Sequence, residues 1–133
     1  MNFLKQLEKS FNSAICTSTN GVKKAAVLFS GGVDSSLIAK AVSEKVSETK
    51  LYVVGLEKSK DIEFAELAAK KLNLNLKKII VKEKDVPNFV EKTSKAIDSI
   101  DLLQLQIGVP EFIALEAIQK DCFKIVFSLL KFA

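Results

Sequence analysis

Hydrophobic residues follow two different spacings along the chain. At the start they recur every three to four positions, which predicts an amphipathic helix ending near residues 17–21. Further on, four runs rich in apolar and β-branched residues lie at 24–30, 50–56, 75–81 and 122–128. Because the middle positions of these runs are apolar without alternation, they predict strands covered on both faces, as in a parallel sheet. The residues that mark the first helix are Phe3, Leu4, Leu7, Phe11 and Ile15.

Segments with helical spacing separate the predicted strands. They lie at 35–47, 61–73, 86–97 and 109–120. Asp61 is the expected N-cap of the second segment, and Pro87 and Pro110 are expected in the first turns of the last two. The resulting order predicts an α/β fold, a three-layer open parallel sheet of about four strands with helices on both faces. The length of 133 residues fits a single domain, 1–133.

Composition narrows the chemistry that this domain can perform. All 20 basic residues are lysines, and the chain has no histidine. No histidine can therefore act as a general base or metal ligand, and an anion must be held by lysine or by backbone amides. The net charge of +4 comes from lysines scattered among 16 acidic residues, which favours solubility and gives only weak support for a nucleic-acid partner.

Cysteine spacing and the lack of long apolar runs indicate a cellular compartment. Cys16 and Cys122 show no metal-ligand spacing and are far apart, which is typical of reduced thiols. No stretch approaches the roughly 18 consecutive apolar residues of a membrane span, and the N-terminal segment lacks the pattern of a cleaved signal. We therefore expect a cytoplasmic protein with no membrane partner.

The string SGGVDSS at residues 30–36 carries the clearest chemical signal. Gly31 and Gly32 allow a tight turn from strand to helix and let a ligand approach bare backbone. Successive amides from Gly31 to Ser36 would then surround an anion at the positive end of a helix dipole. The hydroxyls of Ser30, Ser35 and Ser36 add donors, while Asp34 would repel phosphate unless it caps the loop or meets it through Mg²⁺.

Two other interpretations of this string bear on its function. A mononucleotide P-loop needs a lysine that reaches the terminal phosphates, and this loop has none, so transfer of the terminal phosphoryl group fits poorly. A cradle of amides and hydroxyls suits pyrophosphate bound as a unit. Alternatively, the two glycines form only a turn, and the serines and the acid are ordinary capping groups.

The same string, directly after a predicted buried strand, resembles the pyrophosphate loop of the PP-loop ATP pyrophosphatases, which form adenylated intermediates. Two further stretches, 52–74 and 107–128, are similar to the synthetase domain of asparagine synthetases, especially short archaeal relatives. In the first stretch, VGLEKSKD leads into a helix that contains AAKKL. The resemblance covers residues 23–128, with 1–20 as an added helix, and implies an adenine nucleotide alpha hydrolase-like fold.

The resemblance implies ATP, or AMP plus pyrophosphate, with Mg²⁺ as the ligands, and Asp34 as the metal ligand. In asparagine synthetases the side-chain carboxylate of aspartate attacks the α-phosphorus of ATP, and ammonia then displaces AMP. Leu28 and the backbone at Val54 and Gly55 would hold the adenine and ribose. No catalytic residue is assigned. The residues implied for pyrophosphate are Ser30, Gly31, Gly32, Asp34, Ser35 and Ser36.

Two departures from the family pattern bear on activity. The nucleophilic cysteine of the glutaminase domain has no counterpart, because the chain starts MNF and Cys16 lies inside a predicted helix. After the fourth strand the family continues into a second glycine-rich, acid-bearing loop. Ser128 matches its first residue, but LLKFA follows at 129–133. We therefore expect a truncated or degenerate chain, or a subunit completed by another polypeptide, with little synthetase activity alone.

The remaining signals leave alternatives open. Glu57 and Asp61 are either site residues or a solvated acid and an N-cap, and Asp98 and Asp101 either match an acid of the family or are solvated loop residues. Cys122 is expected in the core. The apolar tail formed by Phe127, Leu129, Leu130 and Phe132 is expected to be buried or to form a homodimer contact.

Two other functions compete with the nucleotide-binding synthetase domain. One is a PP-loop adenylase that modifies transfer RNA, which the positive charge favours weakly and the two later stretches oppose. The other is a non-catalytic module that binds a nucleotide or dimerises through the apolar tail.

Overall fold

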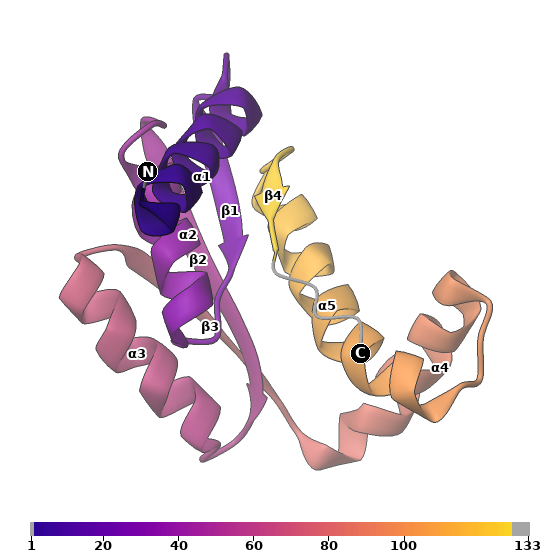
Figure 1. Ribbon diagram of the computed structural model, residues 1–133. Coiled ribbons are helices and arrows are strands. Elements are labelled where there is room, and N and C mark those ends of the chain that lie inside the picture. The colour runs from indigo at the N-terminus through magenta and orange to yellow at the C-terminus, as the bar shows by residue number, and fades with distance from the viewer. Residues whose placement is uncertain (1, 129–133) are drawn as a thin grey trace.

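The computed structural model describes residues 2–128, which form one sheet with helices on both of its faces (Figure 1). All the expected elements are present in the expected order, with a short 3₁₀ turn, η1 (Glu83–Asp85), before the fourth helix. The helices are α1 (Phe3–Thr19), α2 (Val33–Ser43), α3 (Lys60–Leu72), α4 (Val86–Ile97) and α5 (Leu102–Lys120). The strands are β1 (Lys24–Leu28), β2 (Glu48–Leu56), β3 (Asn75–Val81) and β4 (Val126–Phe127).

The four strands are parallel and lie in the order β3-β2-β1-β4. Val27 of β1 pairs with Leu51 of β2 and with Phe127 of β4. The chain moves from β1 outward to β2 and β3, and then returns to place β4 on the other side of β1. The strand order therefore reverses at β1. In open α/β sheets, ligands bind beyond the carboxyl ends of the strands at such a reversal.

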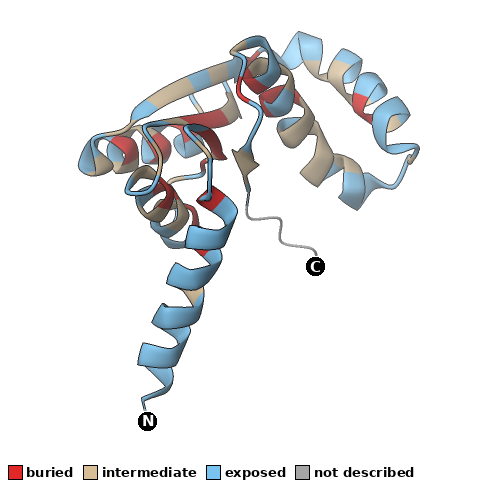
Figure 2. Ribbon diagram, turned by 90° about the horizontal axis from the view of Figure 1, so that it is seen from above, coloured by how far each residue is buried: buried red, intermediate tan, exposed pale blue. Residues whose placement is uncertain are grey.

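The helices cover the two faces of the sheet as the sequence predicts. α2 and α3 pack on one face, with α1 against α2, and α5 packs on the other face against β1 and β2, with α4 beside α5. Figure 2 shows the buried residues between these layers, whereas most of α1 is exposed. Among the described residues, no helix is both long and apolar enough to cross a membrane.

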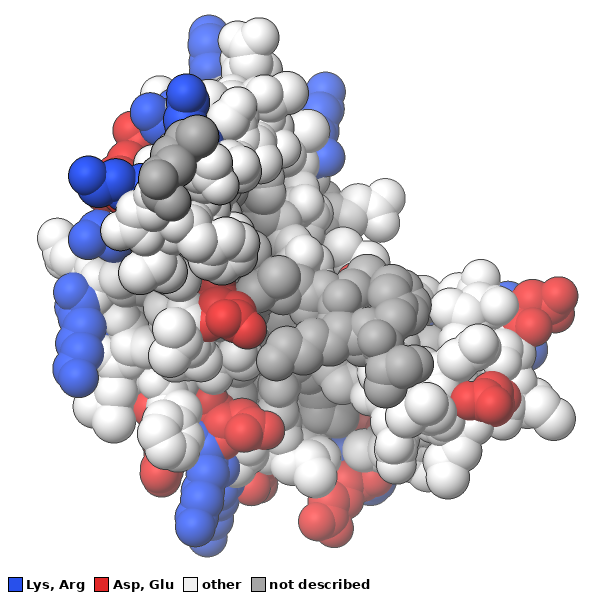
Figure 3. All heavy atoms as spheres, in the orientation of Figure 1, with Lys and Arg blue, Asp and Glu red and all other residues white. Residues whose placement is uncertain are grey.

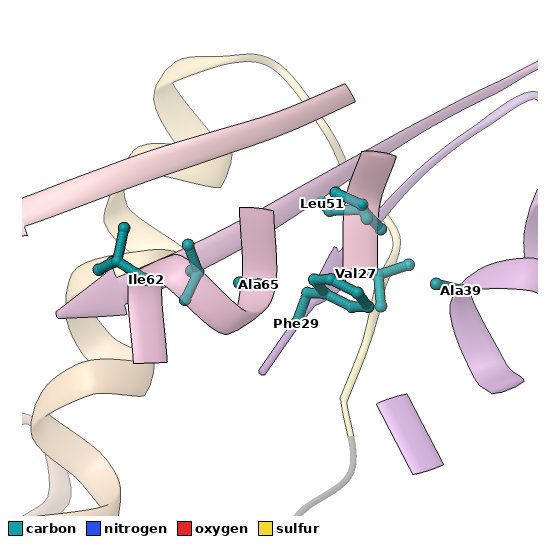
Figure 4. Packing of buried hydrophobic residues seen from close by; sticks show 8 residues of the cluster. Val27, Phe29, Ala39, Leu51, Ile62 and Ala65 are labelled. Carbon is teal, nitrogen blue, oxygen red and sulfur yellow. The ribbon is translucent and has the colours of Figure 1, made fainter. Parts of the chain in front are cut away.

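Consecutive apolar residues in β1 and β2 fill two separate cores because successive side chains point to opposite faces. Figure 4 shows the first core, where Val27 and Phe29 meet Leu51 of β2, Ala39 of α2 and Ala65 of α3. On the opposite face, the second core contains Ala26, Tyr52, Ile118 and Phe123. Alanines at the helix positions allow the helices to lie close to the sheet. The expectation of strands buried on both faces is confirmed for β1 and β2, whereas β3, at the edge of the sheet, is partly exposed.

Two predicted helix starts are wrong. α5 begins at Leu102, not at residue 109, because the side chain of Asp101 accepts a hydrogen bond from the Gln104 amide at 3.1 Å and caps the helix there. Pro110 therefore lies inside α5 instead of in its first turn. The N-cap of α3 is Ser59 rather than Asp61, since the Ser59 hydroxyl accepts from the Asp61 amide at 3.2 Å.

The last apolar run is divided between a turn and a short strand. β4 contains only Val126–Phe127, and Cys122 lies in the turn after α5 with a φ of +65°. Cys122 is exposed, so its expected place in the core is wrong, and Phe123 takes that place instead. Both cysteines are free and exposed. The apolar tail expected at 129–133 lies outside the described residues.

Gly31 passes unusually close to the backbone of α3. Its φ is +82°, and a Cβ built on it would lie 2.9 Å from the carbonyl carbon and oxygen of Phe64. Only glycine fits this combination of a left-handed backbone and a close approach. Gly32 differs, because its φ is −72° and an added Cβ would meet only the Ser30 hydroxyl at 3.4 Å.

A cluster of polar side chains joins the end of α5 to the sheet. The Tyr52 hydroxyl donates to Asp121 Oδ2 at 2.8 Å, and Lys77 and Lys50 donate to the same oxygen at 2.9 and 3.3 Å. The hydrogen bond from Lys77, followed by those from Tyr52 and Lys50, lowers the pKa of Asp121 to about 2. Burial and the bond to Asp121 raise the pKa of Tyr52. We call these four residues the Asp121 clamp.

Replacing Gly31 with alanine is expected to lower the free energy of unfolding by about 2 kcal/mol or more, because the new Cβ meets the backbone of α3 at a strained φ. Urea unfolding followed by circular dichroism measures the loss. Gly32→Ala is the matched control, and its unfolding free energy should stay within about 1 kcal/mol of wild type. Equal losses in the two variants would contradict the close approach.

The Asp121 clamp should make the free energy of unfolding depend on pH in the acidic range. The pKa of Asp121 is about 2 in the folded state against an ordinary value of 3.8, so its stabilising effect is complete above that ordinary value and is lost as pH falls toward 2. The urea midpoint of Asp121→Asn should therefore lie below that of wild type at pH 7, and the difference should shrink in acid. Glu91→Gln, which breaks an exposed pair with Lys95, is the control expected to show almost no change. A difference between wild type and Asp121→Asn that is independent of pH would argue against this assignment.

Candidate functional site

A cavity of about 620 Å³ lies beyond the carboxyl ends of β1 and β2, beside the reversal of strand order. Its volume is within the roughly 300–1,000 Å³ of typical small-molecule sites. The walls come from the turn between β1 and α2, the end of β2, the N-terminal half of α5 and the residue after β4. The residues that line the cavity include Leu28, Ser30, Gly32, Asp34, Ser35, Tyr52, Val54, Asp61, Ile107, Pro110, Glu111, Ala114 and Ser128.

Hydrogen bonds within the turn hold its shape. The Ser30 and Ser35 hydroxyl oxygens lie 3.1 Å apart, and the Ser30 amide donates to the Ser35 hydroxyl at 3.3 Å. The Ser30 hydroxyl also accepts from the Gly32 amide at 3.3 Å. Ser35 is buried, so its hydroxyl belongs to the framework of the turn. These serines therefore pre-form the loop that opens α2.

The N-terminus of α2 points its first-turn amides at the cavity mouth. Gly32 is the N-cap of α2, and no side chain caps the helix there. The first amides of a helix have no carbonyl partner within it and carry the positive end of the helix dipole. The row of amides is shorter than the sequence predicts, because the Ser36 amide already donates to the Gly32 carbonyl at 3.0 Å. An anion at this helix end would meet amides that begin at Val33, because the Gly32 amide already donates to the Ser30 hydroxyl.

Six of the nine residues expected to bind the nucleotide line the cavity. They are Leu28, Ser30, Gly32, Asp34, Ser35 and Val54. The other three are not among the lining residues. Gly31 lies against α3, Ser36 is half-buried on α2, and a Cβ on Gly55 would meet Ile62 of α3 at 2.9 Å. Gly31 and Gly55 therefore serve the packing of α3 on the sheet.

The charged side chains that line the cavity are all acidic. They are Asp34, Asp61 and Glu111, and no lysine lines the cavity in the part of the chain that the structure describes. Lysines are interspersed with acidic residues around the face shown in Figure 3. Burial raises the pKa of Glu111. Within residues 2–128 there is no group of three acidic or cysteine side chains arranged to hold a metal ion.

The four other acidic residues that the sequence suggests as site candidates do not all lie at the cavity. Glu57 does not line the cavity, while Asp61 does. Asp98 is the left-handed C-cap of α4, and Asp101 is the N-cap of α5. The two residues of the α4–α5 connection are therefore explained by helix capping.

The sequence does not predict that α5 forms a wall of the cavity. Ile107, Glu111 and Ala114 line the cavity, and they follow helical spacing that continues to Ile118 in the core. The predicted helix start at residue 109 hid this spacing, because it left Ile107 outside the helix. Tyr52 was also missed, although it lies on the same face of β2 as Val54.

Comparison with known structures supports the architecture. The protein is similar to an NMN synthetase from Francisella tularensis, with a TM-score of 0.58 and 14% identity, over 84% of this chain and 50% of the other. It is also similar to an NH₃-dependent NAD synthetase from Campylobacter jejuni, with a TM-score of 0.55 and 19% identity, over 90% and 53%. These likenesses confirm the expected adenine nucleotide alpha hydrolase-like fold.

A third similar structure is a predicted subunit of tRNA methyltransferase from Methanocaldococcus jannaschii. Its TM-score is 0.57 and its identity 26%, over 83% of this chain and 55% of the other. This similarity includes most of the sheet and its helices. What that protein acts on is a separate question from the fold that the two share.

Sequence comparison identifies the family. The chain is 41% identical over 122 residues to the "Putative asparagine synthetase 1 (glutamine-hydrolyzing)" of Methanocaldococcus jannaschii. The match covers 92% of this chain and 22% of that relative, so the chain spans about a fifth of its length. The Asparagine synthase family pattern matches residues 6–128, which include the turn, the cavity and both cores. The chain therefore belongs to the asparagine synthase family.

Proposed function

We propose that this protein binds ATP together with Mg²⁺ in the cavity beyond β1, as the nucleotide-binding part of an enzyme that adenylates a carboxylate. The observation that carries the proposal is the N-terminus of α2, which opens without a side-chain cap into a cavity of about 620 Å³ at the reversal of strand order. A helix end of this kind binds phosphate through backbone amides. Membership of the asparagine synthase family supports the same ligand.

The backbone and hydroxyl groups of the turn suit a diphosphate, because several groups can contact it at once, whereas a single charged side chain offers one contact point. Gly32 presents bare backbone at the cavity, and the Ser30 and Ser35 hydroxyls hold the turn around it. Leu28 and Val54 lie at the ends of adjacent strands and would pack against the adenosine part. In this arrangement the pyrophosphate is bound as a unit, which leaves the α-phosphorus accessible to a carboxylate nucleophile.

The acidic lining explains why a divalent cation would accompany the nucleotide. Three carboxylates and no lysine line the cavity in the described part of the chain, so a bare triphosphate would be repelled. Magnesium usually binds through one or two carboxylates together with phosphate oxygens, rather than in a complete protein cage. Asp34 is the acid at the start of α2 and is the residue proposed to meet the ion. Magnesium would neutralise charge that develops on the phosphates.

The complete ligase reaction needs more than this cavity supplies. The chain spans 22% of the Methanocaldococcus jannaschii relative, and the acidic residues that line the cavity are explained by nucleotide and metal binding. We assign the acceptor-binding and ammonia-supplying groups to a further polypeptide segment or partner. In this proposal, nucleotide binding belongs to residues 2–128 and amide formation to the assembly.

A second candidate is an adenylase acting on transfer RNA. The likeness to a predicted tRNA methyltransferase subunit favours it, at 26% identity. The interspersed charges on the face in Figure 3 and the acidic cavity oppose it. Filter binding to transfer RNA over a salt series separates the two, because a polyanion partner would bind more weakly as salt rises.

Calorimetric titration with ATP and Mg²⁺ tests nucleotide binding directly. Wild type should bind, while Gly32→Val should lose roughly tenfold or more in affinity, because its branched side chain fills the bare backbone at the helix end. Removing Mg²⁺ with a chelator should weaken ATP binding to wild type by a similar factor, since the charged side chains that line the cavity in the described part of the chain are all acidic. Absence of any nucleotide heat from folded wild type would refute the proposal.

The matched control for that experiment is Ser36→Ala. Ser36 is half-buried on α2 and does not line the cavity, although the sequence suggests it as a pyrophosphate ligand. Its affinity for ATP should therefore equal that of wild type within twofold, roughly the effect expected of a surface substitution. A loss at Ser36 equal to that at Gly32 would place the phosphates outside the cavity.

A further inference from the structure

We propose that Glu111 determines which nucleotide base the cavity accepts, by accepting a hydrogen bond from the 6-amino group of adenine. This inference rests on the proposed function, because it assigns the base-binding end of the same cavity. Glu111 is not among the residues that the sequence suggests for nucleotide binding. It enters the site from α5, on the opposite face of the sheet from α2.

The position of Glu111 on α5 is unusual for an acid. Ile107, Glu111, Ala114 and Ile118 recur at four, three and four residues, so they share one face of the helix. That face packs toward the sheet: Ala114 and Ile118 are buried, and Ile118 contacts the core around Tyr52. Glu111 is the acid on this face, and it is half-buried where it lines the cavity. Its carboxylate is therefore open to a polar partner that enters the cavity.

The described protein supplies no such partner. Among residues 2–128, no hydrogen bond or ion pair joins Glu111 to another side chain, and no lysine lines the cavity. Asp121, Glu66 and Glu91 differ from Glu111, because each of them forms an ion pair with a lysine. Burial alone raises the pKa of Glu111, as expected for a carboxyl without a cationic neighbour. A hydrogen-bond donor from a ligand would supply what is missing.

The neighbours of Glu111 indicate what kind of donor arrives there. Leu28 and Val54 lie on the strand face that α5 covers, and they line the cavity together with Ile107 and Ala114. An aromatic base fits between such walls, whereas an ammonium ion would find only one acceptor among them. The phosphates would lie at the other wall, at the N-terminus of α2, because the first-turn amides of that helix attract them.

Adenine and hypoxanthine differ at the position that this carboxylate would read. Adenine carries an amino group at C6, which donates, while the base of inosine triphosphate carries an oxygen there, which accepts and would be repelled by the carboxylate. A site that hydrogen-bonds its ligand rejects an analogue that lacks the donor, whereas an apolar pocket discriminates weakly. Glu111 therefore favours ATP over inosine triphosphate.

The experiment compares the dissociation constants of ATP and inosine triphosphate by calorimetry, both with Mg²⁺, for wild type and variants. Wild type should bind ATP roughly tenfold or more tightly than inosine triphosphate, as expected for a hydrogen bond to a charged acceptor. Glu111→Gln should reduce that ratio sharply, because its amide can donate to the oxygen of inosine. Glu111→Leu should bind both nucleotides with similar affinity.

Glu116→Gln is the matched control, with the same chemical change on the same helix but outside the cavity, and it should keep the wild-type ratio. An unchanged ratio in Glu111→Gln, with ATP still bound, would overturn the inference and leave the proposed function intact. If folded wild type binds neither nucleotide, the proposed function fails as well.

Discussion

The contact between Gly31 and the backbone of α3 is the constraint on which the site depends. It fixes the turn between β1 and α2 at a distance where no side chain fits, with the first residue of the glycine pair in the left-handed region. Gly55 makes a similar close approach from the end of β2 to Ile62. Two strand ends are thereby held against one helix. The consequence is a rigid turn that directs the N-terminus of α2 into the cavity.

This arrangement divides the two glycines between two tasks. Gly31 allows the turn to pack, while Gly32 keeps the helix end open to the cavity. The electrostatics of the site are divided in a similar way. The lysines within residues 2–128 lie elsewhere, in the Asp121 clamp and on the surface, and the cavity is lined by carboxylates and a helix end. Anion binding therefore depends on backbone dipoles and an accompanying cation.

Much of the fold could be predicted from the sequence, and the failures have local physical causes. The runs of consecutive apolar residues and the helical spacings predict every α-helix and strand in the correct order, although not the 3₁₀ turn η1. Capping decided the boundaries that were wrong, since Asp101 starts α5 before Pro110 and Ser59 replaces Asp61. Cys122 was misplaced because an apolar run does not show where a helix ends and a strand begins. Such a turn depends on tertiary packing of Phe123.

The candidate site was predictable on one side only. The turn after β1 carries its own signal in the glycines and serines, which are adjacent in sequence. The opposite wall comes from α5, more than 70 residues later, and only the packing of that helix on β1 and β2 brings Glu111 to the turn. The resemblance to asparagine synthetases predicts a pyrophosphate loop at this turn. Of the residues that it implies, Gly31, Gly55 and Ser36 do not line the cavity.

The clamp at Asp121 has a mechanical consequence for the cavity. It anchors the C-terminal end of α5 to β2 and β3, and Glu111 lies ten residues before it on the same helix. At a rise of about 1.5 Å per residue, that is an arm of about 15 Å, so a tilt of a few degrees about the anchor displaces the far wall by about 1 Å. The position of this wall of the cavity therefore depends on the clamp, and Tyr52 belongs to both, since its hydroxyl bonds Asp121 and its side chain lines the cavity.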